Sequence, residues 1–416
     1  MLVSVFFVVI LSCGITRTIT FENPSDYERD DEVIVLTKEL LESKFNAGSQ
    51  LWPVFKVNGQ FLASQVDDLD GDGEWDEAVV LADFTANEKK LVTVEFVEKD
   101  KYPEFEKRTN LRLGIDQQDG SYKEVDYYKA LPCTNDFKII AQGESVSWEN
   151  DKIAFRVYFD CRNVKDLFGK LKPGMIIDKI HTPAIQDYHV LNDWGMDILH
   201  CGSSLGSGGI ALLKNDSLYR LGSTDVYEYH KITEGPVRSV FELVYKGWHV
   251  DGDNLEATER ISVYPGKYWF QSDVSVNGLP EGAQIVTGIV TSMLKRDPFA
   301  FEADGFQVIG THDIQSLNND ELGMAVLVPQ NEAGKIGCTS NTNYFNLGHR
   351  TVVEKGFSNI ISETYYIGQK AAGNKPARHY FAAVWGLEKI QWKTEEGFKK
   401  YLEEEAVRFS LPIKIN

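Results

Sequence analysis

The chain has 416 residues, of which 43% are hydrophobic and 25% are charged, so it can bury one large hydrophobic core or two ordinary ones. Its formal net charge of −19 disfavours nucleic acid and anionic membrane surfaces as general partners, because both repel an acidic protein. An anionic substrate is still compatible with this charge, since a local basic pocket can outweigh the field of the whole molecule.

The chain begins with an apolar run at 2–11, within the sequence MLVSVFFVVILSC. This run is too short to span a bilayer but has the length of a signal-peptide hydrophobic region. The tetrapeptide ILSC, which ends at Cys13, resembles the lipobox of bacterial lipoproteins. We therefore expect a signal peptide over 1–12, lipidation of Cys13, a tether over 13–20 and an outer-membrane location facing the periplasm or the cell surface. No Lys or Arg precedes the run, and a buried N-terminal strand is the alternative.

The other cysteines stand alone in the sequence. None belongs to a CxxC pair, and their spacings suit no zinc site. One or two disulfides after export, or buried free thiols, are both compatible with this pattern. These cysteines are Cys133, Cys161, Cys201 and Cys338.

Most of the chain consists of short segments of alternating apolar and polar residues split by Gly, Asn, Asp and Pro, which is typical of β-strands. Helical patterns occur at 37–45 and 394–409, where Thr394 is placed to cap a helix. Phe398, Tyr401 and Leu402 would share one face of that helix. We expect a mostly β protein, with a single β-sandwich catalytic domain over 21–416 built from large antiparallel sheets, a few short helices and a C-terminal helix.

The stretch VDDLDGDGEWDEAVVLADF, residues 66–84, alternates aspartates with glycines before an apolar run. Asp68, Asp70, Asp72 and Asp76 have the 1, 3, 5, 9 carboxylate spacing of a calcium loop. A valine stands where an EF-hand has its bidentate glutamate, and both flanks have strand patterns. We therefore expect a strand–loop–strand hairpin with local hydrogen bonds from the aspartates. A bound calcium ion and a catalytic carboxylate cluster are the alternatives.

The densest gathering of polar, aromatic and glycine residues lies at 179–213. Histidine titrates near neutral pH and can therefore give or take a proton in catalysis. His189 is the first candidate for such a role because aspartates and aromatic residues surround it, although a lone histidine is more often structural. The candidates in this segment are His181, His189, His200, Asp187, Asp193, Asp197, Tyr188 and Trp194.

The same segment contains a match to G-x-S-x-G, the nucleophile elbow of serine hydrolases, at 202–206. That elbow requires a strand before the serine and a helix after it. The residues that follow, SGGIALL, are rich in glycine and have a β pattern, so a hydrolase is disfavoured. A phosphate-binding loop is also disfavoured, because no Gly-Lys-Ser/Thr follows the glycines.

A second cluster of candidates lies at 227–249. Arg238 is expected at the start of a strand, where a guanidinium can hold a carboxylate with two hydrogen bonds; a structural ion pair is the alternative. Tyr229 and His230 are further candidates for proton transfer. Aromatic residues make up 12% of the chain, which suits sugar-stacking faces, although most of these rings will belong to the core.

Three segments carry a resemblance to a known family: DYHVLNDWGMDILHCGSSLGSGGIAL, EGPVRSVFELVYKGW and DDLDGDGEWDE. They resemble signature segments of the family of domains of unknown function numbered 4861, which are lipoproteins of Bacteroidota polysaccharide-utilisation clusters. The similarity covers nearly the whole chain beyond the signal. The sequence GPVR followed by long strands is also similar to galactose-mutarotase-like β-supersandwiches, and this likeness implies that fold.

One branch of the family is described as ulvan oligosaccharide dehydratases. The resemblance thus implies a carbon–oxygen lyase that removes water from the non-reducing-end glucuronic or iduronic acid of sulfated oligosaccharides, leaving a 4,5-unsaturated sugar. It would act after a polysaccharide lyase and before an unsaturated glucuronyl hydrolase. A polysaccharide lyase, which expels a sugar instead of water, and a non-catalytic lipid-anchored glycan-binding protein are the alternatives. Calcium is the cofactor that the sequence suggests.

This reaction assigns expected roles to the candidates. The C5 proton of a uronate is weakly acidic, so the charge of the adjacent carboxylate must be neutralised as the carbanion develops. We expect Arg238 to do this, or a metal ion in its place. The candidates for the base and the acid are His189, His230, Tyr188 and Tyr229.

The remaining candidates would support these groups. Asp197 or Asp193 would orient a histidine and determine its tautomer. We expect His189 and Arg238 to face one concave sheet surface near His230, because base, acid and carboxylate clamp must converge on one sugar ring. The substrate-binding candidates are His181, Trp194 and Trp248.

Overall fold

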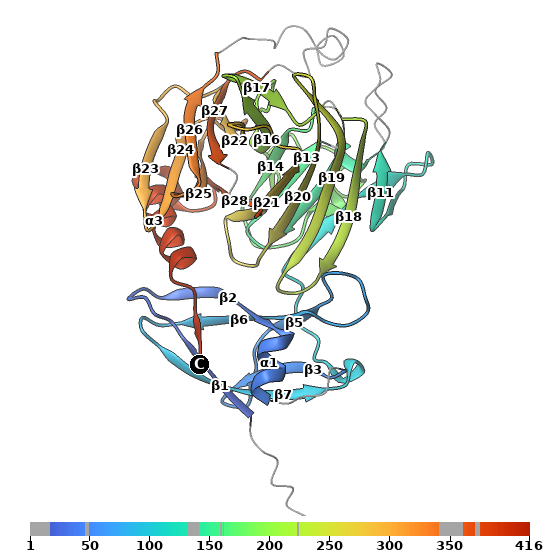
Figure 1. Ribbon diagram of the computed structural model, residues 1–416, viewed down its shortest axis with the longest axis vertical. Helices are drawn as coiled ribbons and strands as arrows, with labels where there is room; N and C mark the ends of the chain where they lie inside the picture. Colours follow the sequence, from blue (N-terminus) through green and yellow to red (C-terminus); the bar gives the residue numbers. More distant parts are fainter. Residues whose placement is uncertain are drawn as a thin grey trace, which may run out of the picture.

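The computed structural model describes residues 17–45, 50–130, 141–158, 160, 162–222, 224–340, 361–370 and 375–416. Strands predominate in this part of the chain and pair in antiparallel sheets (Figure 1). Its α-helices are α1 (Lys38–Phe45) and α3 (Glu395–Ser410). These features confirm the predicted fold class: mostly β, with a large antiparallel β-sandwich, few short helices and a C-terminal helix.

The predictions for the first 16 residues, including the signal peptide and the lipidation of Cys13, concern a part of the chain that the structure does not describe. Cys133 and Cys161 also lie outside the described residues. Cys201 is a buried free thiol and Cys338 an exposed one. None of the helices that the structure describes is both long enough and apolar enough to cross a membrane.

The first 80 or so described residues form a small β-sandwich, drawn in blue in Figure 1. Its two sheets have the strand orders β29-β1-β7-β3-β4 and β2-β6-β5. Its core is apolar and separate from that of the rest, with Phe21, Phe55 and Trp75 among its buried residues. The strands are β1 (Arg17–Glu22), β2 (Arg29–Thr37), β3 (Trp52–Val57), β4 (Gln60–Phe61), β5 (Ser64–Asp67), β6 (Glu77–Phe84), β7 (Lys89–Val97) and β29 (Lys414–Ile415).

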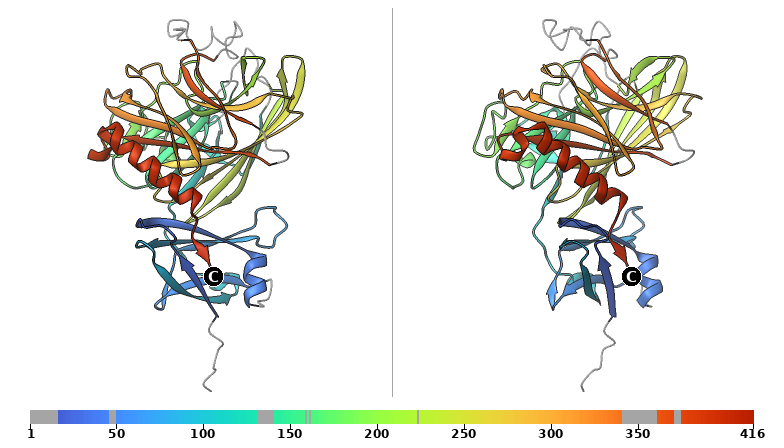
Figure 2. Two further views of the ribbon diagram at one scale, coloured as in Figure 1. Left: turned by 60° about the vertical axis from the view of Figure 1, so that its left-hand side comes forward. Right: turned by 90° about the vertical axis from the view of Figure 1, so that its left-hand side faces the viewer.

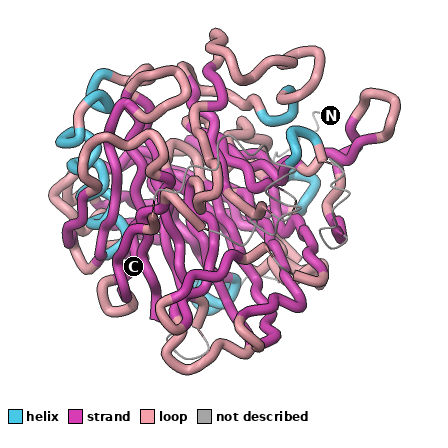
Figure 3. Tube along the Cα trace, turned by 90° about the horizontal axis from the view of Figure 1, so that it is seen from above, coloured by secondary structure: helices cyan, strands magenta, loops and turns pink. Residues whose placement is uncertain are grey.

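The rest of the chain forms a larger sandwich, and one of its layers is a nine-stranded sheet. The sheet has the order β11-β18-β19-β20-β21-β28-β25-β24-β23. Seen from above in Figure 3, strands fill the body of the molecule and helices lie at its edge. The strands are β11 (Tyr127–Ala130), β18 (Val226–Glu234), β19 (Ser239–Val250), β20 (Asp253–Val263), β21 (Trp269–Asn277), β28 (Ala377–Trp385), β25 (Glu321–Pro329), β24 (Phe306–Ile314) and β23 (Phe299–Ala303).

The second layer consists of two five-stranded sheets, β15-β14-β13-β12-β8 and β17-β16-β22-β27-β26, which a bridge between Lys165 and Gly206 connects. A separate hairpin joins β9 (Gly114–Asp116) to β10 (Tyr122–Glu124). The strands are β8 (Thr109–Arg112), β12 (Ser145–Asn150), β13 (Ile153–Tyr158), β14 (Lys165–Lys170), β15 (Gly195–Asp197), β16 (Ser207–Lys214), β17 (Ser217–Arg220), β22 (Gln284–Val290), β26 (Ala333–Cys338) and β27 (Thr364–Lys370).

Aromatic rings fill the space between the two layers. Trp148 and Phe155 of the second layer pack against Phe241, Phe270 and Phe381 of the nine-stranded sheet, with ring centroids 4.9–6.2 Å apart. Each of these residues belongs to one continuous apolar core. Because side chains alternate along a strand, the residue on either side of each ring points to the outer face of its layer.

Helix α3 covers part of the outer face of the nine-stranded sheet (Figure 2). The hydroxyl of Thr394 accepts a hydrogen bond from the backbone N–H of Gly397, as predicted for the cap. Phe398 and Leu402 are buried against the sheet, and Tyr401 packs beside them. Single 3₁₀ turns lie at Lys99–Lys101, Gln142–Glu144, Ile177–Lys179 and Ile390–Lys393.

The sequence predicts one sandwich over 21–416, whereas the structure has two apolar cores within this range. The sequence gives no sign of this division, because no linker of distinctive composition separates the two parts. The last strand, β29, returns to pair with β1, so the small sandwich contains both ends of the described chain. The predicted hairpin at 66–84 is confirmed, since β5 and β6 pair antiparallel around the aspartate-rich loop.

Candidate active site

Three charged residues lie side by side on the outer face of the β15-β14-β13-β12-β8 sheet. Phe155 and Leu167 point into the core, so their neighbours Arg156 and Asp166 point outward, directly opposite each other in the register. Asp197 extends the row on the next strand, β15. The strands of this sheet thus place two carboxylates around one guanidinium.

Arg156 is almost fully buried, with 2% of its surface exposed. Its Nη2 donates hydrogen bonds of 2.6 Å to Asp166 and of 2.6 Å to Asp197, and its Nη1 donates to the carbonyl of Gly143. Burial by itself would lower the pKa of Arg156, but the two carboxylates raise it well above its ordinary value. The guanidinium is therefore a permanent charge that holds its neighbours in place.

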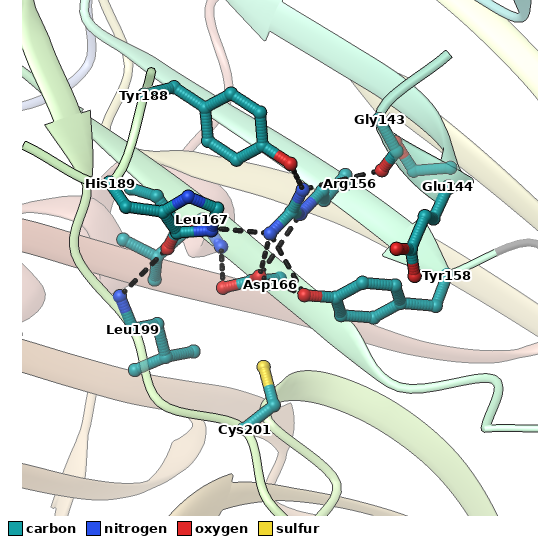
Figure 4. Close-up of polar contacts among 12 residues, drawn as sticks. Gly143, Glu144, Arg156, Tyr158, Asp166, Leu167, Tyr188, His189, Leu199 and Cys201 are labelled. Atoms are coloured by element: carbon teal, nitrogen blue, oxygen red, sulfur yellow. Dashed lines mark hydrogen bonds and ion pairs between the residues drawn. The ribbon is translucent and has the colours of Figure 1, made fainter. Parts of the chain in front are cut away.

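Two tyrosine hydroxyls point toward this guanidinium, as Figure 4 shows. The Tyr158 hydroxyl accepts a 2.8 Å hydrogen bond from Nη2 of Arg156 and donates one of 2.9 Å to Asp166. The Tyr188 hydroxyl lies 3.4 Å from Nη1 of Arg156. Both rings also pack against the guanidinium, whose central carbon is 4.7 and 5.4 Å from their centroids. The arginine thus fixes two phenols that are largely shielded from solvent: Tyr188 is 7% exposed, and the Tyr158 proton is already donated to Asp166.

His189 lies at the solvent side of the cluster, with 60% of its side chain exposed. Its ring packs on Tyr188 with centroids 4.3 Å apart, and the Asp187 carboxylate accepts a hydrogen bond from its backbone N–H. Partial burial, and then the charge of Arg156, lower the pKa of His189 below its ordinary value. The imidazole is therefore neutral at pH 7 and able to accept a proton.

Asp197 differs from the role that the sequence suggested for it. Its Oδ2 is 3.8 Å from Nε2 of His189, beyond hydrogen-bonding distance. Burial and the neighbouring Asp166 raise the pKa of Asp197 to about 8, although Arg156 opposes the shift. At neutral pH Asp197 is mostly a neutral acid, so it does not orient the imidazole as an ionised carboxylate would.

His181 is exposed beside this cluster. Its ring lies between Tyr122 of β10 and the buried Tyr188, with centroid distances of 6.1 and 6.3 Å, so two exposed imidazoles, His181 and His189, flank the Tyr188 ring. Trp194 is not available to a sugar, because it is buried beneath the loop, where it packs near Phe168. This corrects the substrate-binding role expected for Trp194.

Two other candidates from this segment have partners outside the cluster. Asp193 is exposed and forms a 2.8 Å ion pair with Lys172, so it orients no histidine. His200 is half-buried, and its Nδ1 lies 3.3 Å from the hydroxyl of Ser292.

Tyr229 and Trp248 belong to the core between the layers. Tyr229 is fully buried and packs near Phe241, and Trp248 is buried with its Nε1 donating to the carbonyl of Arg220. Burial also raises the pKa of Tyr229 above its usual range. Neither side chain can touch a substrate, so both predicted roles are wrong: the alternation of β18 and β19 turns these rings inward.

His230 and Arg238 are not brought to His189. Because its neighbour Tyr229 points into the core, His230 points to the outer side of the nine-stranded sheet, where its Nε2 lies 3.5 Å from Glu228. Arg238 is buried at the junction with the small sandwich, where it donates to Asp67 and, over 2.8 Å, to Glu77. The predicted shared concave surface is therefore absent, and Arg238 fits the structural alternative.

The serine motif at 202–206 has no elbow geometry. Ser204 is fully buried, and its hydroxyl donates to the carbonyl of Cys201. The residues after Gly206 form strand β16 instead of a helix. A serine nucleophile is therefore excluded here.

The acidic loop brings together three of its four aspartates. Ligand atoms of Asp68, Asp70 and Asp76 all lie within 4.8 Å of one another, while Asp72 is outside this group. All four carboxylates accept backbone hydrogen bonds within the loop, as the turn interpretation requires. The clustering of oxygen ligands fits a hard cation such as calcium. The loop belongs to the small sandwich, so a catalytic role beside His189 is not supported.

The sequence analysis did not single out Arg156, Tyr158 and Asp166. A signal was present: in KIAFRVYFD, the arginine and tyrosine are two positions apart in an otherwise apolar strand, so they share one face. A charged residue in such a strand is buried only when it is paired. The partner on the neighbouring strand depends on the register, which the sequence does not reveal.

Fold and site together define a β-sandwich protein with a histidine–tyrosine cluster on an outer sheet face. The family model described as "Domain of unknown function (DUF4861)" matches residues 21–415, so the chain belongs to this family. This confirms the resemblance to that family.

Among curated proteins, the chain is 25% identical over 360 residues to "Uncharacterized protein P7" of Formosa agariphila, covering 79% of this chain and 82% of that protein. Among solved structures it is similar to an alpha-mannosidase from Enterococcus faecalis, with a TM-score of 0.46 and 10% identity over 96% of this chain. A glycosyl hydrolase family 38 protein from Enterococcus faecalis gives a TM-score of 0.46, 9% identity and 96% coverage. The chain spans less than half of both structures, 45% and 47%.

Proposed function

We propose that this protein is a carbohydrate dehydratase that removes water from a non-reducing-end uronic acid of an acidic oligosaccharide. The observation that carries the proposal is the pairing of an exposed, neutral imidazole, His189, with the hydroxyl of Tyr188, which Arg156 holds. A β-elimination needs one group to take a proton and another to give one, both on a single sugar ring. The cluster on the outer sheet face offers both.

In this mechanism His189 takes the proton from C5 of the uronate. The electron pair of the C5–H bond forms the C4–C5 double bond, and the C4–oxygen bond breaks. Tyr188 donates its proton to the departing hydroxyl, which leaves as water, and the proton on the imidazole restores the phenol through solvent. Arg156 favours these steps indirectly, since its charge keeps the imidazole neutral and its Nη1 lies 3.4 Å from the Tyr188 hydroxyl, which holds that group in place.

His181 is the exposed group placed to meet the substrate's carboxylate or the next sugar ring. It lies next to Tyr188, and an imidazole N–H can donate a hydrogen bond to a carboxylate. Arg156 cannot serve as this clamp, because its guanidinium is buried and already hydrogen-bonded to protein groups. His181 therefore takes over the binding role first expected of Arg238.

The biological setting follows from the resemblance and forms part of the proposal. The substrates would be ulvan-type sulfated oligosaccharides that end in glucuronic or iduronic acid. A polysaccharide lyase would produce them, and an unsaturated glucuronyl hydrolase would consume the product. The protein would be exported and anchored by a lipid at Cys13.

The test is mass spectrometry of oligosaccharides with a saturated uronic acid at the non-reducing end, before and after incubation. We expect each product to be lighter by one water, with new absorbance from the conjugated double bond. Shortened chains would instead indicate a polysaccharide lyase, and binding without any product would indicate a glycan-binding protein. His189→Ala should abolish the new absorbance, while His249→Ala, which changes an exposed histidine elsewhere, should leave it intact.

A further inference from the structure

A crevice of about 200 Å³ lies where the small sandwich, helix α3 and the outer face of the nine-stranded sheet meet. Figure 2 shows α3 leading from the large sandwich toward the small one at this junction. The crevice and the His189 cluster lie on the outer faces of different layers, so they are separate sites. Among the lining residues are Glu32, Lys267, Trp269, Tyr380, Arg408 and Phe409.

Lys267 is the unusual group in this crevice. It is 4% exposed, and among the described residues its ammonium makes one hydrogen bond, of 3.3 Å, to the carbonyl of Asp30. Two other buried lysines, Lys165 and Lys170, each have a carboxylate at 2.6 and 2.5 Å. No carboxylate in the described part of the chain lies within ion-pairing distance of Lys267. Burial lowers the pKa of Lys267. Glu405, Glu32 and Asp31 act on its charge only from beyond ion-pairing distance, so an anionic ligand in contact with the ammonium would stabilise its charged form.

The walls of the crevice suit a sugar. Tyr380 and Phe409 stack face to face with centroids 3.7 Å apart, and Trp269 meets Tyr380 edge to face at 5.2 Å. Trp269 and Tyr380 are 6% and 8% exposed, so the half-exposed ring of Phe409 is the part of this wall that a ligand can contact. Glu32 adds a carboxylate whose Oε2 has no hydrogen-bond partner in the described structure. Aromatic faces accept the apolar face of a pyranose, and carboxylates accept hydrogen bonds from its hydroxyls.

Arg408 adds a second positive charge at the mouth of the crevice. It forms a 3.4 Å ion pair with Glu405, which also accepts a 2.7 Å hydrogen bond from Nε1 of Trp269. The charge of Glu405 is thus shared between Arg408 and the indole, whereas Lys267 has no such partner. Glu32 is likewise paired, 3.3 Å from Arg29, so among the described charges that line the crevice Lys267 is the one without a contact ion pair, which favours one negative group on the ligand.

We propose that this crevice is a second binding site, which takes a single sugar ring bearing one carboxylate or sulfate group. The anionic group lies against Lys267 and the ring lies against the aromatic wall. The site does not depend on the dehydratase proposal, because it shares no residue with the His189 cluster. By touching both sandwiches at once, the bound sugar ties the small sandwich to the large one.

The experiment uses the full chain carrying His189→Ala, so that turnover cannot contribute. Isothermal titration with glucuronate, a sulfated monosaccharide, glucose and inorganic sulfate identifies the ligand. We expect at least one of the two acidic sugars to bind and to raise the melting temperature, since a ligand of the native state alone stabilises it. Whether the carboxylate or the sulfate ester binds more tightly identifies the anionic group.

Lys267→Met should weaken binding by about tenfold or more, because it removes a hydrogen bond to a charged group. The matched control is Lys335→Met, which changes an exposed lysine on β26. Val35→Trp fills the crevice from its exposed edge on β2 without removing any polar group, and it should also abolish binding. This second variant keeps the proposal testable if Lys267→Met does not fold.

Three results would overturn the proposal: no binding of either acidic sugar, equal binding of glucose, or full binding by Lys267→Met and Val35→Trp. If inorganic sulfate binds as tightly as the sugars, the crevice is an anion site and the sugar assignment is wrong. None of these outcomes affects the dehydratase proposal, which is tested by product formation at His189.

Discussion

At the scale of single residues, the chemistry of the candidate site depends on Arg156, which does not reach solvent. Its charge lowers the proton affinity of His189 and orients the hydroxyls of Tyr158 and Tyr188. A buried arginine cannot lose its proton at any physiological pH, so this influence is constant. The imidazole of His189 and the carboxyl of Asp197 are the groups in the cluster whose charges change near neutrality.

The pH dependence of turnover follows from the lowered pKa of His189. The neutral imidazole is the active form, so the rate should fall with decreasing pH only below about 6.5, the ordinary histidine value. His189→Ala should reduce turnover by roughly 10²–10⁴, the usual contribution of a general base. The measurement is the initial rate of double-bond formation between pH 4 and 9. A rate that already falls with decreasing pH above about 6.5 would contradict the role of His189 as a base that Arg156 keeps neutral.

The raised pKa of Asp197, about 8, affects stability with a definite sign. Between its unfolded value of roughly 3.9 and its folded value, the native state holds a proton that the unfolded state has lost. The contribution of Asp197 to stability is therefore greatest at acidic pH and declines as pH rises toward 8. Asp197→Asn keeps the shape and cannot ionise, so its stability relative to wild type should improve from pH 5 to pH 8. Urea unfolding at both pH values measures this; a constant difference would show that Asp197 is ionised throughout.

At the scale of secondary structure, the segment before β15 carries Tyr188 and His189 to the sheet. Gly195 starts β15 with φ of 138°, and a Cβ at this position would lie 1.8 Å from the carbonyl oxygen of Gly169 on β14. The close approach of these two strands places Asp197 next to Arg156. Only glycine permits it, because any side chain would push β15 away.

Gly195→Ala should therefore reduce turnover by about tenfold or more, since displacing reacting groups by an ångström can cost roughly 10²-fold. The backbone shift would move Tyr188 and His189 away from Arg156. Gly174→Ala is the matched control, because Gly174 also has positive φ but no atom within 4 Å of its added Cβ. Steady-state kinetics and circular dichroism of both variants test this. Equal activity of the two variants would show that turnover does not depend on the close contact between β14 and β15.

The acidic loop allows a test by metal removal. Asp68, Asp70 and Asp76 gather their oxygens within 4.8 Å, and like charges so close repel each other unless a cation binds. We expect calcium to raise the melting temperature and EDTA to lower it, with the shift lost in Asp70→Asn. Asp72→Asn, outside the group, is the control for loss of charge alone. If calcium and EDTA leave the melting temperature unchanged, the loop is a turn held by its own backbone hydrogen bonds.

At the scale of the whole molecule, the two sandwiches are joined through buried polar contacts. Arg238 donates to Asp67 and Glu77 of the small sandwich, and Gln65 accepts hydrogen bonds from the backbone N–H groups of Val237 and Arg238. These contacts connect β5 and β6 to the start of β19. An ion pair in this position holds the two cores at a fixed orientation.

Arg238→Ala tests this role. Removing one partner of a buried ion pair leaves an uncompensated charge and typically costs about 3–5 kcal/mol of stability. We expect the variant to unfold at much lower denaturant concentration while the folded fraction keeps a near-normal turnover number. Arg260→Ala, which removes a half-exposed ion pair with Glu242, is the control and should cost at most about 1 kcal/mol. A large loss of turnover in a variant of normal stability would contradict this and would indicate that Arg238 has a catalytic role.

Local patterns were enough to predict several parts of the fold. The alternation in β2, the apolar run of β6, the Thr394 cap and the buried face of α3 each depend on neighbours within a few residues, and all are present in the structure. Tyr188, His189 and Asp197 lie near one another in the structure, as expected from their closeness in the chain, and their roles in catalysis stay a prediction. The prediction that Tyr229 and Trp248 belong to the site was wrong, because an aromatic-rich pattern alone does not show which side chains of a strand point into the core.

The sequence by itself determined the β-rich class and the hairpin at 66–84, and it pointed to the segment around His189 as a candidate site, because periodicity and residue chemistry are local properties. Only the tertiary structure decided that Arg156 and Asp166 complete the cluster and that Arg238 joins the two sandwiches. It also showed that the small sandwich has a core of its own and that, among the described residues, no carboxylate forms an ion pair with Lys267. These facts depend on which strands pair, in what register, and which buried charge meets which partner, and the free energy of burying a charge depends on that partner.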